Sequence, residues 1–301
     1  MQPWRLLDLA ANDAFANMAI DEAMLNACIQ RNDVPATVRF YTWSPPAVSI
    51  GCLQKISGNF DPAQAKEFGL DTVRRPTGGR SVLHKGDLTC SVVFAENNPL
   101  IPRGILASYQ KINQAVQRGL WRLGIPSQLC PKRKGSRSSF CFSGVAQYEI
   151  LVHGKKIMGN AQKRTKGACL HQGSIMAEDQ QKLIRQLFPQ PGDSSPYQEE
   201  PNRDGTESEA GAEAGTGAKA GTGTKAGTAT RAGVSEFISL EEVLGMPVAV
   251  SLVKEALIRG FEEIFHICFT FGSLTDWEEE EAARLIQEKY SRHIWNKEGH
   301  L

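Results

Sequence analysis

Cys141 is a possible nucleophile, and Lys156, a possible cationic partner, follows it fifteen residues later in the sequence. Cys141 lies between two phenylalanines after a polar loop, and Lys156 follows within a glycine-bracketed stretch, GKKIMG. A free thiol with a pKa of about 8.5 is mostly protonated at neutral pH, and a nearby ammonium lowers that pKa and favours the thiolate nucleophile. Taken alone, Cys141 is also compatible with a core thiol and Lys156 with a surface lysine.

A glycine turn upstream is the second candidate for chemistry. In RRPTGGRSVLH, Gly78 and Gly79 allow positive φ and let the backbone approach a ligand without an intervening Cβ. Arg75 and Arg80 flank the turn, and His84 lies on the strand predicted to follow. An ordinary hairpin with surface arginines would contain the same residues.

The composition is that of a water-soluble globular protein. The 301 residues are 41% hydrophobic and 22% charged, with a net charge of +1, which offers no argument for nucleic-acid or membrane binding. The seven cysteines form no CxxC pair, so neither a disulfide framework nor a metal site is predicted. Free thiols and the absence of a signal segment predict a cytoplasmic location. Apart from Cys141, the cysteines are interpreted as small hydrophobic residues: Cys28, Cys52, Cys90, Cys130, Cys169 and Cys268.

Hydrophobic periodicity predicts the elements that must position these residues. Short β-like runs with turns occupy residues 37–94, and residues 147–164 have the pattern of a hairpin with HGKK at its tip. Asn17 is the expected N-cap of the first helix, and Asp21 and Glu22, early in that helix, would interact favourably with the helix dipole. Helices are predicted over residues 17–32, 108–124, 182–188, 239–265 and 274–295, the last two beginning with capping boxes, Ser239 with Glu242 and Thr275 with Glu278.

Residues 190–234 differ in kind from the rest of the chain. They repeat a short Ala-Gly-Thr unit with a charged residue and contain almost no bulky apolar side chains, so they are predicted to be a disordered insertion. Residues 1–189 would form the first part of a single α+β domain, and residues 235–301 would complete it with helices. A mostly antiparallel sheet flanked by helices is the expected architecture.

Several stretches resemble one superfamily. RRPTGGRSVLH, YEILVHGKKIMGNAQKR and HQGSI are similar to the signature of the lipoate–protein ligases, biotin–protein ligases and octanoyltransferases, as are NMAIDEAML and VRFYTWSPPAVSIGCLQ. The similarity covers nearly the whole chain except the insertion. Arg80, where the ligases usually carry a third glycine, and Cys-Phe before Tyr-Glu resemble the LipM-type octanoyltransferases.

This resemblance implies a biotin/lipoate-protein ligase-like fold and a double displacement that needs no cofactor. Octanoyl would pass from octanoyl-acyl carrier protein to Cys141, which matches the family nucleophile, and then to the lipoyl-accepting lysine of glycine cleavage H protein or another lipoyl domain. Lys156 matches the family's catalytic lysine. The residues expected to bind substrate are Arg75, Thr77, Gly78, Gly79, Arg80, His84, Gly159 and Ala161.

Two other functions remain open at this point. An ATP-dependent lipoate–protein ligase would use Lys156 on a lipoyl-adenylate, and a non-catalytic binder of lipoyl domains would need no cysteine. A further expectation concerns the basic run before Cys141, which is either a solvated charge run or a docking patch for the acidic acyl carrier protein. The run consists of Lys132, Arg133, Lys134 and Arg137.

Overall fold

The computed structural model describes residues 2–31, 34–56, 60–132, 145–188 and 237–300. The described residues on both sides of the gap at 189–236 belong to one folded unit. The predicted insertion, residues 190–234, lies outside the described residues. In the described part of the chain, no helix is both long and apolar enough to cross a membrane.

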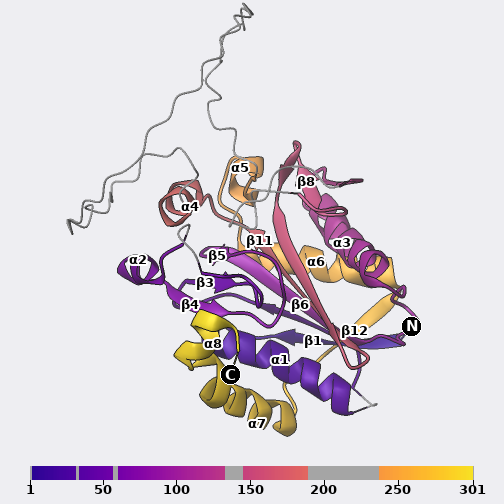
Figure 1. The fold of residues 1–301 in the computed structure, drawn as a ribbon. Helices are drawn as coiled ribbons and strands as arrows, with labels where there is room; N and C mark the ends of the chain where they lie inside the picture. The colour runs from indigo at the N-terminus through magenta and orange to yellow at the C-terminus, as the bar shows by residue number, and fades with distance from the viewer. Residues whose placement is uncertain (1, 32–33, 57–59, 133–144, 189–236, 301) are drawn as a thin grey trace, which may run out of the picture. The chain divides into compact units, whose positions relative to one another are not determined.

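A six-stranded sheet forms the centre of the folded unit, in the order β10-β11-β6-β2-β1-β12 (Figure 1). Its first four strands pair antiparallel, and β1 pairs parallel with both β2 and β12. The predicted α+β architecture with a mostly antiparallel sheet is therefore confirmed. The strands are β1 (Gln2–Asp8), β2 (Thr37–Tyr41), β6 (Asp87–Ala95), β10 (Met158–Thr165), β11 (Ala168–Met176) and β12 (Ile267–Phe271).

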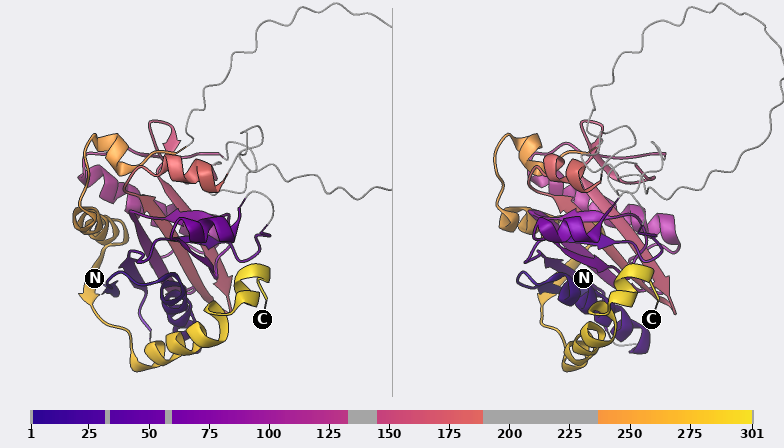
Figure 2. Two further views of the ribbon diagram at one scale, coloured as in Figure 1. Left: turned by 90° about the vertical axis from the view of Figure 1, so that its left-hand side faces the viewer. Right: turned by 60° about the vertical axis from the view of Figure 1, so that its left-hand side comes forward.

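Helices cover both faces of this sheet. Alternate residues of a strand point to opposite faces, and Leu6 packs in one core cluster with α3 and α6 whereas Leu7 packs in another with α1. Figure 2 shows the two helix layers from the side. The helices of these layers are α1 (Ala14–Gln30), α3 (Ile105–Arg122), α6 (Val250–Phe265) and α7 (Asp276–Leu285).

Two small sheets carry the sequence motifs. In the first, β3 (Ala47–Ile50) lies between β4 (Asp71–Arg74) and β5 (Val82–His84), so the glycine turn connects two strands that both border β3. In the second, β8 (Ile150–Val152) lies between β7 (Gln128–Leu129) and β9 (Lys155–Lys156). The predicted hairpin is therefore confirmed for β8 and β9, whereas β10, the rest of that stretch, pairs with β11.

Three of the helix predictions need correction. The N-cap of α1 is Asp13, whose carboxylate accepts from the Ala16 N–H, so Asp21 and Glu22 lie beyond its first turn. The predicted helix over 239–265 is broken between α5 (Leu240–Leu244) and α6, where Gly245 adopts a left-handed conformation and Pro247 follows. The predicted helix over 274–295 is α7, a π-helical turn (Ile286–Tyr290) and part of α8 (His293–Glu298).

The remaining helix predictions agree with the structure. Both capping boxes are present, at Ser239 with Glu242 and at Thr275 with Glu278. The helix predicted over 108–124 is α3, and the short helix predicted over 182–188 is α4 (Gln181–Leu187). One further short helix, α2 (Pro62–Glu67), precedes β4.

Candidate functional site

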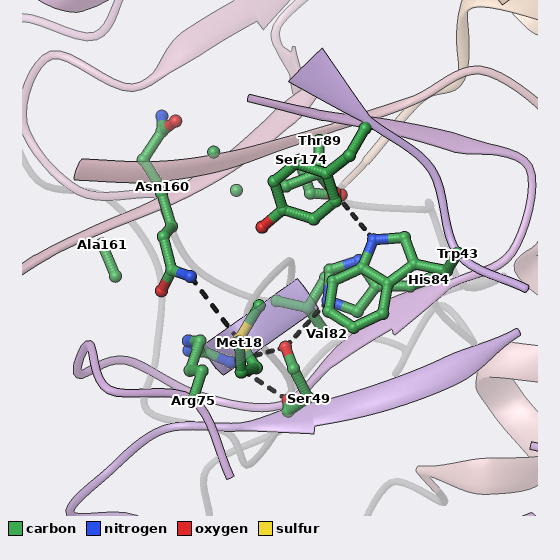
Figure 3. A pocket seen from close by; sticks show the side chains of 14 residues that line it. Met18, Trp43, Ser49, Arg75, Val82, His84, Thr89, Asn160, Ala161 and Ser174 are labelled. Carbon is green, nitrogen blue, oxygen red and sulfur yellow. Dashed lines mark hydrogen bonds between the residues drawn. The ribbon is translucent and has the colours of Figure 1, made fainter. Parts of the chain in front are cut away.

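A cavity lies between α1, the glycine turn and the sheet (Figure 3). The sheet register aligns two rows of side chains across four strands on the face that borders it. One row is Tyr41, Thr89, Ser174 and Gly159, and the other is Arg39, Ser91, Gln172 and Ala161. Because Gly159 and Ala161 add little or no side chain at the β10 end, these rows leave space there.

The cavity wall is mostly apolar. The cavity is narrow, with a volume of about 30 Å³. Its apolar lining includes Met18 from α1, Tyr41 at the end of β2, Trp43 just after β2, and Val82 from β5. A narrow apolar cavity with a few fixed polar groups is the usual form of a small-molecule site.

His84 belongs to a hydrogen-bonded relay in this wall. Its Nδ1 lies 2.8 Å from Asp87 Oδ2 and its Nε2 lies 2.8 Å from Ser49 Oγ, with all three residues buried. Because a carboxylate only accepts, Nδ1 carries a proton, and Ser49 Oγ, which accepts from Arg75, lies within hydrogen-bond distance of Nε2. The imidazole stacks on Trp43 with ring centroids 3.9 Å apart. Thr89 in turn accepts from the Trp43 indole N–H, so the ring pair is fixed from both sides.

Arg75 holds the glycine turn as well as lining the cavity. Its guanidinium donates to the carbonyls of Gly78 at 2.7 Å and Arg80 at 2.7 Å, and to Ser49 Oγ at 3.0 Å. Gly79 has a φ of 87°, which favours glycine. The turn packs directly on Gly51, where a Cβ would lie 2.0 Å from the Gly79 carbonyl oxygen.

Thr77 connects the turn to a buried polar network beneath it. Its hydroxyl donates to Gln172 Oε1 at 2.6 Å, and Gln172 Nε2 donates to Asp21 Oδ2 at 2.7 Å. Asp21 also forms a fully buried ion pair with Arg39 at 2.6 Å, and the Tyr41 hydroxyl donates to it. Burial together with the nearby Asp21 charge holds the pKa of Tyr41 well above its usual value.

Lys156 lies on β9 and is only 1% exposed. Its Nζ donates to Glu149 Oε1 at 2.7 Å.

Of the predicted site residues, the structure brings four into the cavity wall, namely Arg75, His84, Gly159 and Ala161. Thr77, Gly78, Gly79 and Arg80 form the adjoining turn, and neither they nor Lys156 are among the described residues that line the cavity. Cys141 and most of the basic run, residues 133–137, lie outside the described residues.

The other thiols differ in environment. Burial raises the pKa of Cys90 and of Cys169 to about 12 in each case, and that of Cys28 to about 11. Cys130 is buried and donates its S–H to the Lys132 carbonyl. The interpretation as buried hydrophobic residues is thus correct for Cys90, Cys130 and Cys169.

Two cysteines depart from that interpretation. Cys268 is exposed, because β12 is an edge strand and this residue faces away from the core. Cys52 is half-buried in the loop after β3.

His171 is buried on the face of β11 opposite Gln172, so it does not face the cavity. Its Nδ1 lies 3.1 Å from Gln162 Nε2, and desolvation lowers its pKa to about 3. His171 is therefore a neutral core residue.

Several site residues escaped sequence reasoning. Asp87 follows His84 by three residues, a local signal that could have identified the pair. Ser49, Asp21 and Gln172 offered no such signal, because each meets its partner only through the fold.

Comparison with known proteins identifies the family to which this chain belongs. Residues 13–206 match the family model described as the lipoyl protein ligase A/B catalytic domain. An octanoyltransferase LipM of Moorella thermoacetica is 34% identical over 300 residues, covering 98% of each chain. An octanoyltransferase LipM of Symbiobacterium thermophilum is 35% identical over 300 residues, covering 97% of each chain.

Solved structures agree at the level of the fold. A crystal structure of lipoate-protein ligase A bound with ATP has a TM-score of 0.73 at 26% identity, with 98% of this chain and 99% of that chain covered. A bi-partite lipoate protein ligase from Thermoplasma acidophilum has a TM-score of 0.73 at 24% identity, with 100% and 98% covered.

Proposed function

Because the chain belongs to the lipoyl protein ligase A/B catalytic-domain family and, within it, to the LipM octanoyltransferases, we propose that it transfers octanoyl groups from octanoyl-acyl carrier protein to the lipoyl-accepting lysine of a partner protein. The observation that carries this proposal is the match to octanoyltransferases LipM over almost the entire length of both chains, at 31–35% identity. The preferred acceptor in the proposal is glycine cleavage H protein.

The proposed reaction has two displacements. The Cys141 thiolate attacks the carbonyl carbon of the octanoyl thioester, and the carrier's thiol leaves with its bonding electron pair and takes up a proton. The neutral lysine amine of the acceptor then attacks the octanoyl-cysteine, forming an amide and releasing the Cys141 thiolate, while the amine loses a proton to solvent. Exchange between thioesters is nearly balanced and conversion to an amide is downhill, so neither step needs ATP.

The chain's own groups have distinct parts in this scheme. The apolar cavity beside Trp43 and Val82 would widen to hold the octanoyl tail. Burying its six or seven CH₂ groups at about 0.8 kcal/mol each contributes on the order of 5 kcal/mol, enough to select this chain over a short one. Lys156 would favour the Cys141 thiolate and orient the acyl carbonyl, and the N–H groups of Gly78 and Gly79 are candidates to stabilise the developing oxyanion.

The environment of the other thiols supports Cys141 as the nucleophile. The raised pKa values of Cys28, Cys90 and Cys169 keep those thiols protonated at neutral pH, and a protonated thiol is a poor nucleophile. Cys52 is half-buried in the loop that packs under the glycine turn, which makes Cys52→Ser the matched control for any test of Cys141.

A second candidate function is ATP-dependent lipoate ligation. It is favoured by the 26% identity and TM-score of 0.73 to a lipoate-protein ligase A bound with ATP. The two functions differ in their donor. Purified protein should therefore be incubated with an acceptor lipoyl domain and either octanoyl-acyl carrier protein without ATP, or lipoate with ATP and Mg²⁺.

Mass analysis of the acceptor separates the outcomes. We expect octanoylation of the acceptor lysine in the ATP-free reaction. Lipoylation confined to the ATP-containing reaction would replace the transferase with the ligase, and an unmodified acceptor in both reactions would leave only a binder.

A further inference from the structure

The buried ion pair between Glu149 and Lys156 is costly for a purely structural contact. The two side chains are 4% and 1% exposed, and Nζ lies 2.7 Å from Oε1. Their chain neighbours Ile150 and Ile157 lie in the hydrophobic core. Removing two charges from water costs more than packing apolar residues of similar volume, so such a pair is weak evidence for stability. Stability alone is therefore a weak explanation for this pair, and its contacts are the ones to examine for a chemical role.

Glu149 uses both carboxylate oxygens. Oε1 accepts from the Lys156 ammonium, and Oε2 accepts from the Ala146 backbone N–H at 2.7 Å. Ala146 lies five positions after Cys141 in the sequence. The same carboxylate thus connects the proposed catalytic lysine to the backbone that leads back to the proposed nucleophile.

The backbone around Glu149 is built to hold this orientation. Tyr148 has a φ of 67°, which a bulky residue adopts only when its surroundings impose it. Its N–H donates to the Cys130 carbonyl at 2.7 Å, and its carbonyl accepts from Asn113 Nδ2 of α3 at 2.9 Å. The Cys130 N–H in turn donates to the Glu149 carbonyl at 2.8 Å. Asn113 of α3 and Cys130, just after β7, therefore fix the turn that places the carboxylate beside Lys156.

We propose that Glu149 is a positioning residue for acyl transfer: it fixes the Lys156 ammonium with one oxygen and the backbone after Cys141 with the other. This inference rests on the proposed function in that it takes Lys156 and Cys141 as the residues that act on the octanoyl thioester. Glu149 itself does not touch the substrate. Its effect reaches the reaction through the position and charge of Lys156.

The first test measures Lys156 in the free protein and needs no transfer activity. Full-length wild type, Glu149→Gln and Glu149→Asp are treated briefly with a water-soluble acetylating reagent. Peptide mass spectrometry then gives the ratio of the acetylated fraction of Lys156 to that of the exposed Lys166 in the same sample, the Lys156/Lys166 ratio. Loss of the carboxylate removes the ion pair that holds Nζ at 2.7 Å, so the amine reacts more readily with the reagent. We expect the Lys156/Lys166 ratio to rise at least tenfold in Glu149→Gln and less in Glu149→Asp, which keeps the charge on a shorter side chain.

A matched control removes a comparable buried pair far along the chain from Lys156. Glu278 is 1% exposed and binds Arg5 with both oxygens, at 2.6 and 2.7 Å. Glu278→Gln should leave the Lys156/Lys166 ratio at its wild-type value. An unchanged ratio in Glu149→Gln, or an equal rise in Glu278→Gln, overturns the positioning role. If Glu149→Gln is insoluble, Glu149→Asp is used in the same test. A Lys156/Lys166 ratio in Glu149→Asp equal to that of wild type would then overturn the proposal.

The second test follows octanoylation of the enzyme by a small octanoyl thioester in a single turnover. We expect Glu149→Gln to react at least tenfold more slowly at saturating donor, with little change in the half-saturating donor concentration and partial recovery in Glu149→Asp. A higher half-saturating donor concentration with an unchanged limiting rate would contradict the inference. If wild type is not octanoylated at all, the proposed function fails, whereas the acetylation ratios still decide whether Glu149 holds Lys156.

Discussion

A titratable side chain that is buried without a charged partner is held in its neutral form. His171 illustrates the effect, because it occurs in the HQGSI motif but is buried, with Nε2 unpartnered among the described residues. Desolvation disfavours its charged form and lowers its pKa to about 3. A histidine that stays neutral across the physiological range cannot serve as a proton donor and acceptor at neutral pH, and its contribution is to stability.

This environment predicts a pH dependence of stability. The pKa of about 3 in the folded state is lower than the value of about 6.5 expected in the unfolded chain. The stabilisation is therefore fully present above pH of about 6.5 and is lost as the pH falls toward about 3. Relative to His171→Leu, which cannot titrate, wild type should lose about 2 kcal/mol of unfolding free energy between pH 7 and about pH 5. Urea unfolding of both proteins measures this, and parallel pH profiles would refute the assignment.

Among the elements, the loop after β3 and the glycine turn behave as one unit. Gly51 supports the carbonyl of Gly79, and Arg75 closes the turn from the other side. Any side chain at position 51 must displace the turn, which at Gly79 packs next to Ala161 of β10. The shape of the cavity therefore depends on a residue outside the RPTGGR motif.

Two glycine substitutions test this dependence. A Cβ at Gly51 would lie 2.0 Å from the Gly79 oxygen, whereas a Cβ at Gly78 would have nothing within 4 Å. Gly51→Ala should lower the free energy of unfolding by about 1–3 kcal/mol and slow octanoylation at least tenfold. Gly78→Ala should stay within about 1 kcal/mol of wild type, and because alanine keeps the backbone N–H proposed to face the oxyanion, it should lose less activity than Gly51→Ala. Thermal unfolding and single-turnover acylation of both variants provide the comparison, and equal effects would argue against the Gly51 contact.

Signals between nearby residues made the helices and strands predictable, whereas contacts between distant residues could not be predicted from the sequence. Both capping boxes are encoded within four residues, and both are present. The start of α1 was misplaced because Asn17, a good capping residue, instead binds Arg39 with its side chain in the core. The buried role of Asp21 could not be read from its place in a helix, since its partners come from β2, β6 and β11.

At the scale of the whole molecule, the family motifs carried the prediction of the architecture. The resemblance implied the fold and the Gly78-Gly79 pair predicted the turn, and both are present. The partner of Lys156 was not predictable, because Glu149 reaches it only through the positive φ of Tyr148 and the pairing of β8 with β9. Sequence spacing contains neither of those constraints.

The composition of residues 190–234 predicts that most of this segment is dispensable. Phe188 and Phe237, which flank the gap in the described residues, pack in the same hydrophobic cluster, so a short connection can join them. Deleting Gly192 to Ala232 should change the free energy of unfolding by no more than about 2 kcal/mol, because loop-closure entropy varies slowly with length. Octanoyl transfer should also continue. A large loss of transfer at an unchanged melting temperature would instead identify a docking segment.

The most direct test of the central claim is intact-mass analysis of the enzyme after mixing with octanoyl-acyl carrier protein in the absence of ATP, followed by addition of the acceptor. We predict one hydroxylamine-sensitive octanoyl adduct that maps to Cys141, forms in Cys52→Ser, is absent in Cys141→Ser, and disappears as the acceptor lysine becomes octanoylated. An adduct that persists in Cys141→Ser, or acceptor modification by that variant at the wild-type rate, would contradict transfer through Cys141.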